Sequence, residues 1–89
     1  MKFTCPCCGY KTFTYPPDGS FEICYVCFWE DEAAQLEDPD FAGGANKVSL
    51  RLAQQNFIQF GASEAAMIPH VRPANDSEPK DQTWKPFEK

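Results

Sequence analysis

The amino-acid sequence predicts one small α+β domain, and three observations support this class. The chain has only 89 residues, so its single core is marginal, because a chain this short buries only about 60% of the surface that its unfolded form exposes. Two Cys-x-x-Cys units enclose a strand–turn–strand pattern in the first third of the chain. A helical pattern follows at 49–60. We therefore expect a hairpin reinforced by its cysteines, with one or two helices packed against it.

The predicted hairpin lies between the two cysteine units. Residues 10–15 alternate aromatic or β-branched side chains with polar ones, which is typical of a strand with one buried face. Residues 16–19 (PPDG) are expected to form a turn, because proline presets φ at the first corner and glycine accepts a positive φ at the last. Residues 20–24 then return as the second strand. This hairpin brings the second cysteine unit opposite the first.

The predicted helix at 49–60 has one apolar face. Its members recur at the spacing of one side of a helix, and we expect them to pack against the hairpin: Leu50, Ala53, Phe57 and Phe60.

The ends of this helix are also predicted from residue types. Ser49 or Asn46 can accept the first free amide hydrogen bonds, and Gly61 can end the helix in the left-handed conformation. Ser63 is a candidate cap for a further helical turn at 64–68, which Pro69 is expected to stop.

Two segments divide the chain. We expect residues 1–73 to form the domain and residues 74–89 to form a polar tail, which has too few apolar residues to be a core element. Trp84 and Phe87 are the side chains of this tail that can dock onto the domain. Trp84 is predicted as a partner contact, so its replacement by alanine is expected to leave the melting temperature nearly unchanged.

The cysteines carry the most specific signal. Cys5 and Cys8 form one pair and Cys24 and Cys27 the other, with fifteen residues between the pairs, a spacing typical of a four-cysteine zinc site. Two thiolates three positions apart in a tight turn can bind one tetrahedral ion. Zinc is therefore the expected ion, with iron as the alternative. Four cysteines close the coordination sphere and leave no place for an activated water, which favours a structural site.

Two residues depart from a symmetric pair of cysteine units. Cys7 is the fifth cysteine, and because it adjoins Cys8 the two side chains diverge, so we expect it to be unligated. A small packed or surface thiol is the first interpretation of Cys7, and a redox sensor or replacement ligand is the second. Phe28 follows Cys27 where a glycine follows Cys8. We expect Phe28 and Trp29 to pack over the site.

The charge distribution predicts the kind of partner. The chain carries 8 basic and 13 acidic residues, a net charge of −5, and residues 30–40 hold six acids and no base. A basic protein partner fits such a run, because opposite charge accelerates encounter. The alternative is a solvated, acidic helix face. The predicted partner surface comprises Glu30, Asp31, Glu32, Glu37 and, in the tail, Trp84.

Nucleic-acid binding by a zinc ribbon is the alternative function. Several aromatic side chains in the first third of the chain can stack on bases: Phe3, Tyr10, Phe13, Tyr15 and Phe21. Only Lys2 and Lys11 accompany them there, and the net negative charge repels phosphate. Packing in the core is the simpler role for these rings.

An enzyme is disfavoured. Cys-x-x-Cys units also occur in dithiol oxidoreductases, but in a βαβ setting that this sequence lacks. His70, the one histidine, lies far along the chain from every cysteine, so we expect a surface or packing residue rather than a Cys–His pair or a fifth ligand.

The sequence also predicts a compartment. No stretch approaches the run of about 18 apolar residues that spans a membrane, and the N-terminus reaches Cys5 without the apolar segment of a signal peptide. We expect a cytoplasmic protein, in which thiols stay reduced and closely spaced cysteines bind metal rather than form disulfides.

Several separated motifs together resemble the bacterial cysteine-rich CPCC domain. They keep their order over about residues 3–73: CPCCGY at 5–10, ICYVCFWED at 23–31, DPDFAGGAN at 38–46, SL at 49–50, QNF at 55–57, FGA at 60–62 and VRP at 71–73. Tyr25 departs from the family, which usually has proline there, but both flanking cysteines remain. The resemblance implies a small, zinc-binding protein with no established activity. Similar proteins are often found beside polymorphic toxin genes, which suggests an immunity or antitoxin role.

Overall fold

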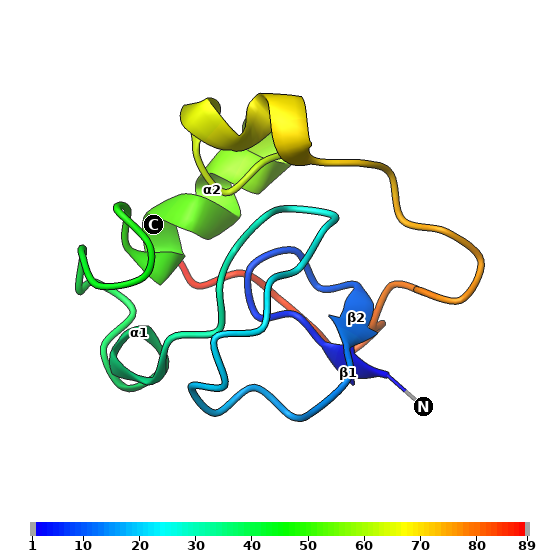
Figure 1. The fold of residues 1–89 in the computed structure, drawn as a ribbon, viewed down its shortest axis with the longest axis horizontal. Helices are drawn as coiled ribbons and strands as arrows, with labels where there is room; N and C mark the ends of the chain where they lie inside the picture. The colour runs from blue at the N-terminus through cyan, green and yellow to red at the C-terminus, as the bar shows by residue number, and fades with distance from the viewer. Residues whose placement is uncertain (1, 89) are drawn as a thin grey trace.

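The structure, a computed structural model, describes residues 2–88. In chain order these form strands β1 (Phe3–Thr4) and β2 (Lys11–Phe13), helices α1 (Ala33–Glu37) and α2 (Leu50–Phe60), and a 3-10 helix, η1 (Ala65–His70) (Figure 1). The molecule measures 31 × 25 × 23 Å. The small α+β class is therefore confirmed. Among the described residues, every helix is too short or too polar to cross a membrane.

The strand pairing differs from the prediction. β2 pairs antiparallel with β1, with Phe3 opposite Phe13, so its partner precedes the first cysteine unit. The predicted strand at 20–24 is wrong. That segment instead pairs with residues 29–31: the amide of Cys24 donates to the carbonyl of Trp29 at 2.9 Å, and a single bridge joins Ile23 to Glu30.

Each cysteine unit therefore closes its own short hairpin. The first lies between β1 and β2, and the second lies between residues 21–24 and 29–31. The amide of Thr14 donates to the carboxylate of Glu22 at 2.8 Å, so a side-chain contact replaces the expected ladder between 10–15 and 20–24.

Helix α2 confirms the prediction from periodicity. The Ser49 hydroxyl accepts the amide hydrogen of Leu52 at 3.1 Å, and Gly61 ends the helix with φ 83°. Leu50 and Ala53 are buried as expected. Phe57 is half-buried, whereas Phe60 is 39% exposed, so the expectation that Phe60 belongs to the core is wrong.

The turn predicted at 64–68 exists in a different form. It is the 3-10 helix η1, and Pro69 lies inside it rather than beyond it. Ser63 does not cap it, because Ser63 is buried and its amide donates to the carbonyl of Cys27 at 2.8 Å.

Sulfur dominates the core. Half of its ten buried members are cysteines, and the others are Phe13, Val26, Trp29, Leu50 and Ala53. Trp29 is fully buried in the same core cluster as the cysteines, in agreement with the prediction that it packs over them. Its indole N–H donates to Gln35 at 3.0 Å.

The end of the chain crosses the first cysteine unit (Figure 1). We call residues 79–87 the C-terminal clamp. The indole N–H of Trp84 donates to the carbonyl of Pro6 at 2.9 Å, and the amide of Phe87 donates to the side chain of Gln54 at 2.8 Å. Trp84 thus packs within the molecule, in contrast to its predicted role as a partner contact.

Candidate metal centre

The first cysteine pair lies in a tight turn, residues 5–9, which we call the first knuckle. The amide of Gly9 donates to the carbonyl of Cys5 at 2.9 Å, and the amide of Cys5 donates to the carbonyl of Tyr10 at the same distance. Gly9 has φ 82°, a conformation that glycine adopts without steric cost. This turn places the side chains of Cys5 and Cys8 on one side.

The second knuckle, residues 24–28, repeats this geometry. The amide of Phe28 donates to the carbonyl of Cys24, and Phe28 has φ 69° at the position equivalent to Gly9. A residue with a Cβ atom is strained there by about 1–2 kcal/mol. The Phe28 ring stacks on His70, with centroids 5.2 Å apart, and meets the Tyr25 ring edge-on at 5.8 Å. These contacts place His70 beside the second knuckle as a packing residue.

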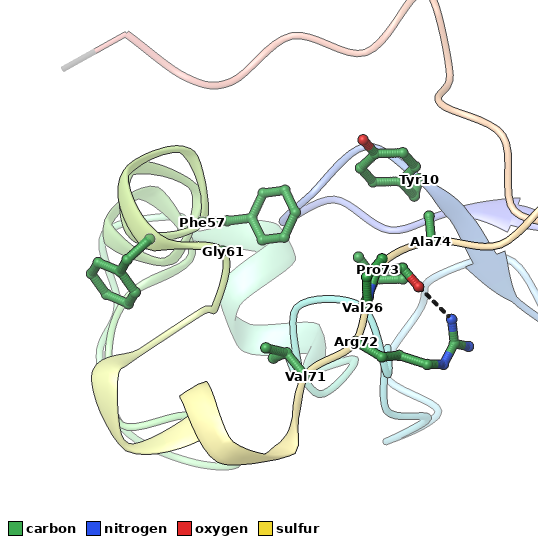
Figure 2. Close-up of a pocket in the computed structure, with 9 residues that line it drawn as sticks. Tyr10, Val26, Phe57, Gly61, Val71, Arg72, Pro73 and Ala74 are labelled. Atoms are coloured by element: carbon green, nitrogen blue, oxygen red, sulfur yellow. Dashed lines mark hydrogen bonds between the residues drawn. The ribbon is translucent and has the colours of Figure 1, made fainter.

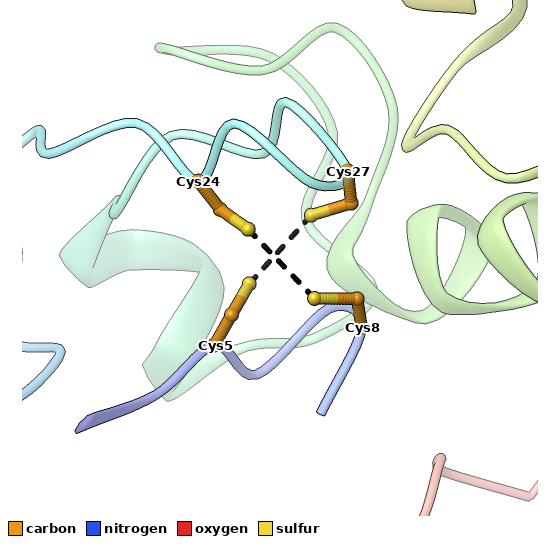
Figure 3. A group of neighbouring side chains, drawn as sticks. All are labelled: Cys5, Cys8, Cys24 and Cys27. Atoms are coloured by element: carbon orange, nitrogen blue, oxygen red, sulfur yellow. Dashed lines mark hydrogen bonds between the residues drawn. The ribbon is translucent and has the colours of Figure 1, made fainter. Parts of the chain in front are cut away.

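Four sulfurs converge between the knuckles (Figure 3). The Cys5 and Cys27 sulfurs are 3.6 Å apart, those of Cys8 and Cys24 are 3.7 Å apart, and all four lie within 4.8 Å of one another. A tetrahedral ion with Zn–S bonds of about 2.3 Å requires sulfurs about 3.8 Å apart. All four cysteines are fully buried. The predicted pairs therefore form a metal-binding arrangement whose size fits zinc.

The electrostatics of the cluster favour a cation. Burial raises the pKa of the Cys5 and Cys27 thiols well above the usual value, whereas hydrogen bonds from the neighbouring thiols, first that of Cys27, lower the pKa of Cys24. Buried thiolates need a compensating positive charge, which a divalent ion supplies.

Two hydrogen bonds to the sulfurs were not foreseen. The Thr12 hydroxyl donates to the Cys24 sulfur at 3.1 Å, and the Trp29 amide faces the Cys27 sulfur at 3.4 Å. Such bonds stabilise thiolates and orient metal ligands. The cysteine spacing could not predict the bond from Thr12 to Cys24, because this contact depends on the pairing of β1 with β2.

Cys7 lies outside the four-sulfur group and is fully buried. Burial raises the pKa of its thiol, which disfavours the thiolate that a redox sensor needs. The packed-thiol interpretation therefore describes its position.

An apolar groove of about 490 Å³ lies beside the centre (Figure 2). Phe57 of α2, Tyr10, Val71 and Ala74 are among the residues that line it. Val26, between two ligands, reaches it, but the four ligand cysteines are not among the residues that line it. The groove is thus lined by apolar side chains and not by the sulfurs.

The acidic run is divided by the fold. Asp31 is fully buried and its carboxylate accepts the amides of Asp18 and Ser20, both at 3.0 Å. Asp31 therefore anchors the 16–20 turn and is not available to a partner, which corrects the predicted surface. The sequence does not reveal which residue of an acidic run the fold buries.

The other predicted acids lie at or beside α1. The Glu32 carboxylate caps this helix through the amide of Ala34 at 3.4 Å and also accepts the amide of Ala45 at 3.0 Å. Glu30 is half-buried and Glu37 is exposed. Glu32 thus has a structural role, while Glu37 presents its charge to solvent.

A comparison with protein families agrees with the cysteine geometry. A comparison with curated protein sequences finds no match. A family model described as "Cysteine-rich CPCC" matches residues 3–78, which include all five cysteines and most of the chain. The chain belongs to the cysteine-rich CPCC family.

Proposed function

We propose that this chain is a zinc-binding, non-enzymatic protein with a zinc-ribbon-like arrangement of two knuckles. The buried four-cysteine cluster carries the proposal, because its ligands come in pairs from two matching turns and its size fits a tetrahedral zinc ion. Bound zinc would supply a cross-link between the two hairpins and compensate the charge of their thiolates. A closed set of four ligands supports a structural ion.

Metal removal tests the structural role. Zinc binding to small modules contributes about 10–16 kcal/mol, whereas whole domains are stable by only about 5–15 kcal/mol. We expect a strong chelator to abolish the cooperative thermal transition seen by circular dichroism. Elemental analysis of the untreated protein should find one zinc, and one iron per chain would overturn the choice of ion.

Cys7 offers a matched control for the ligands. Cys27→Ala removes a ligand and is expected to lose the metal, whereas Cys7→Ala removes an equally buried cysteine outside the cluster and is expected to keep one zinc per chain. Equal metal loss in both variants would contradict the assignment of ligands.

A basic protein is the proposed partner, and an immunity protein that binds a basic toxin domain is the sharpest form of this proposal. The acidic face, Glu30, Glu32 and Glu37, supports it, because these acids form none of the ion pairs of the described residues. Four thiolates and one Zn²⁺ would also change the formal charge from −5 to −7.

A binding experiment tests this partner. The purified chain is used to capture the product of an adjacent gene, and the double variant Glu30→Lys, Glu37→Lys is expected to weaken capture at low salt. Asp76→Lys, an exposed acid outside the face, is the control. Undiminished capture by the double variant would remove the acidic face from the proposal.

Nucleic-acid binding is the second candidate. Two of the predicted stacking rings, Tyr15 and Phe21, are 66% and 57% exposed, whereas Phe13 is buried. A gel shift with single-stranded DNA that weakens as salt rises would favour this candidate over an acidic interaction module.

A further inference from the structure

The backbone of the C-terminal clamp pairs antiparallel with residues 9–11, where the first knuckle ends. The amide of Asp81 donates to the carbonyl of Gly9 at 2.8 Å, and a single bridge joins Tyr10 to Lys80. Backbone pairing sets the position of a residue along its neighbour. Lys80 therefore has a fixed place opposite the residue that follows the first knuckle.

The side chain of Lys80 extends onto the knuckle. Its ammonium donates to the carbonyl of Cys8 at 3.0 Å and lies 4.8 Å from the ring centroid of Tyr10 and 4.6 Å from that of Trp84. Aromatic faces attract a cation at such distances. The Trp84 ring is itself fixed, because its indole N–H donates to the carbonyl of Pro6 at 2.9 Å. Three contacts thus hold the ammonium against the backbone of a cysteine of the cluster.

The charge of Lys80 is not neutralised by a carboxylate in the part of the chain that the structure describes. The two ion pairs found there join Arg51 to Asp40 and Arg72 to Glu78. Arg72 also meets the second knuckle, through its backbone amide, but its guanidinium is paired with Glu78. Lys80 therefore brings an uncompensated positive charge to the first knuckle.

The proposed metal centre lacks such a charge of its own. Four thiolates and one Zn²⁺ carry a formal charge of −2, and all four cysteines are fully buried. A buried net charge is costly unless an opposite charge lies nearby. The chain as a whole is acidic, with a net charge of −5, so it offers few cations for this purpose.

We propose that Lys80 is the counter-cation of the loaded metal centre, positioned by the rings of Tyr10 and Trp84, and that it raises the affinity of the four thiolates for a divalent ion. This inference rests on the proposed zinc site. Lys80 acts from outside the ligand set, as a positioning residue. It also lies beyond residues 3–78, which the family model matches, so the clamp adds this charge to the matched part of the chain.

Zinc affinity of the full chain tests the proposal. Competition with a chromophoric chelator at low salt is measured on chains whose zinc-loaded circular dichroism spectra agree. Lys80→Met keeps the length of the side chain and removes its charge, and it should lower the affinity about tenfold, because loss of an outer partner of metal ligands typically costs roughly 10–100-fold. Lys80→Arg keeps the charge and should recover most of this loss. Unchanged affinity in Lys80→Met would overturn the proposal.

Two further variants separate the charge from other effects. Lys80→Gln keeps a hydrogen-bond donor for the Cys8 carbonyl without a charge, so it should lose affinity as Lys80→Met does. Lys85→Met removes the same charge from an exposed residue of the clamp and should keep the wild-type affinity. A tight Lys80→Gln chain would assign the effect to the hydrogen bond, and an equal loss in Lys85→Met would assign it to net charge. Either result overturns the counter-cation.

The role of the rings is tested through the lysine. Tyr10→Leu removes one of the two rings that hold the ammonium and should lower zinc affinity, whereas Tyr10→Phe keeps a ring and should not. In a Lys80→Met chain, Tyr10→Leu should cost much less, because the ring acts through the ammonium. Additive losses would contradict the positioning of Lys80 by this ring.

The reduction potential of iron-reconstituted chains is a readout of charge that packing alone does not predict. Reduction adds a negative charge to the centre, so removal of a nearby cation makes it less favourable. Lys80→Met and Lys80→Gln should therefore lower the potential, and Lys80→Arg should leave it near the wild-type value. An unchanged or raised potential in Lys80→Met would overturn the proposal.

The outcomes distinguish this inference from the zinc proposal. A wild-type chain that binds no zinc overturns the proposed function. A wild-type chain that binds one zinc tightly, with Lys80→Met equally tight, overturns the role of Lys80 alone.

Discussion

Phe28 shows how a single residue is held against its own backbone preference. It has φ 69° in a turn where the other knuckle has a glycine, and its ring packs between Tyr25 and His70. The aromatic contacts therefore offset strain in the backbone. The sequence predicted that Phe28 packs over the site, whereas its ring packs against Tyr25 and His70 beside the second knuckle. Its conformation was not predicted, because φ is imposed by closure of the knuckle.

This strain predicts an unusual order of stability. Phe28→Gly and Phe28→Ala both lose the ring, but only alanine keeps the steric conflict, so the glycine variant should be more stable by about 1 kcal/mol. Thermal melts of the zinc-loaded proteins measure this difference. Tyr25, which has an ordinary φ, is the control. There the alanine variant should be at least as stable as the glycine variant. The same order at both positions would contradict strain at Phe28.

Gly9 and Trp84 form a coupled pair. Gly9→Ala places a Cβ 2.6 Å from the Trp84 ring at φ 82°, and Trp84→Ala removes both the ring and its bond to Pro6. Each single change is expected to lower the melting temperature by several degrees. The double variant should lose less than the sum, since alanine at 84 leaves space for the new Cβ. Additive losses would show that the ring does not rest on Gly9.

At the scale of elements, local patterns were sufficient for α2 and insufficient for the hairpins. α2 is determined by its own periodicity, by Ser49 and by Gly61, all within thirteen residues. The strands are two or three residues long, and their partners are selected by the knuckles between them. A propensity for strand at 20–24 therefore could not reveal its partner.

The cap of α2 is testable as a local device. Ser49→Ala removes the acceptor of the Leu52 amide and should cost about 1 kcal/mol of unfolding free energy. Ser49→Asp restores an acceptor and should recover most of the loss. Denaturant titration of the zinc-loaded chains measures both, and equal stability of Ser49→Ala and the wild type would show that the cap is not needed.

At the scale of the whole molecule, composition predicted a polar tail, whereas the C-terminal clamp is bonded to the domain. The sequence correctly located the four cysteines that converge in a metal-binding arrangement, because Cys-x-x-Cys spacing reflects the geometry of a tight turn. It did not locate the contacts of the C-terminal clamp, residues 79–87, since hydrogen bonds to the Pro6, Cys8 and Gly9 carbonyls depend on the folded surface and leave no pattern in the segment itself.

The Arg72–Glu78 pair gives the molecule a defined acid response. The Arg72 guanidinium lowers the pKa of the Glu78 carboxyl below its usual 4.5. A lowered folded-state pKa stabilises the fold above the ordinary value, and this contribution disappears as pH falls through the lowered one. Glu78→Gln should therefore reduce stability at neutral pH, and the difference from the wild type should shrink in acid.

Denaturant titrations of the wild type and of Glu78→Gln, from neutral to acidic pH, measure the difference between their free energies of unfolding. Acid acts on the metal in both proteins alike, so this effect cancels from the difference. Metal content is measured at each pH. A difference that stays constant into acid would mean that the ion pair does not carry the effect.

A core in which half of the buried members are cysteines has a consequence for turnover. Five thiols replace the leucines and valines that fill other small domains, so hydrophobic burial alone leaves the metal-free chain close to its unfolding threshold. With a structural ion, the folded fraction follows the free metal concentration by mass action. Proteases degrade the unfolded fraction, so the abundance of this protein then rises and falls with the free metal concentration.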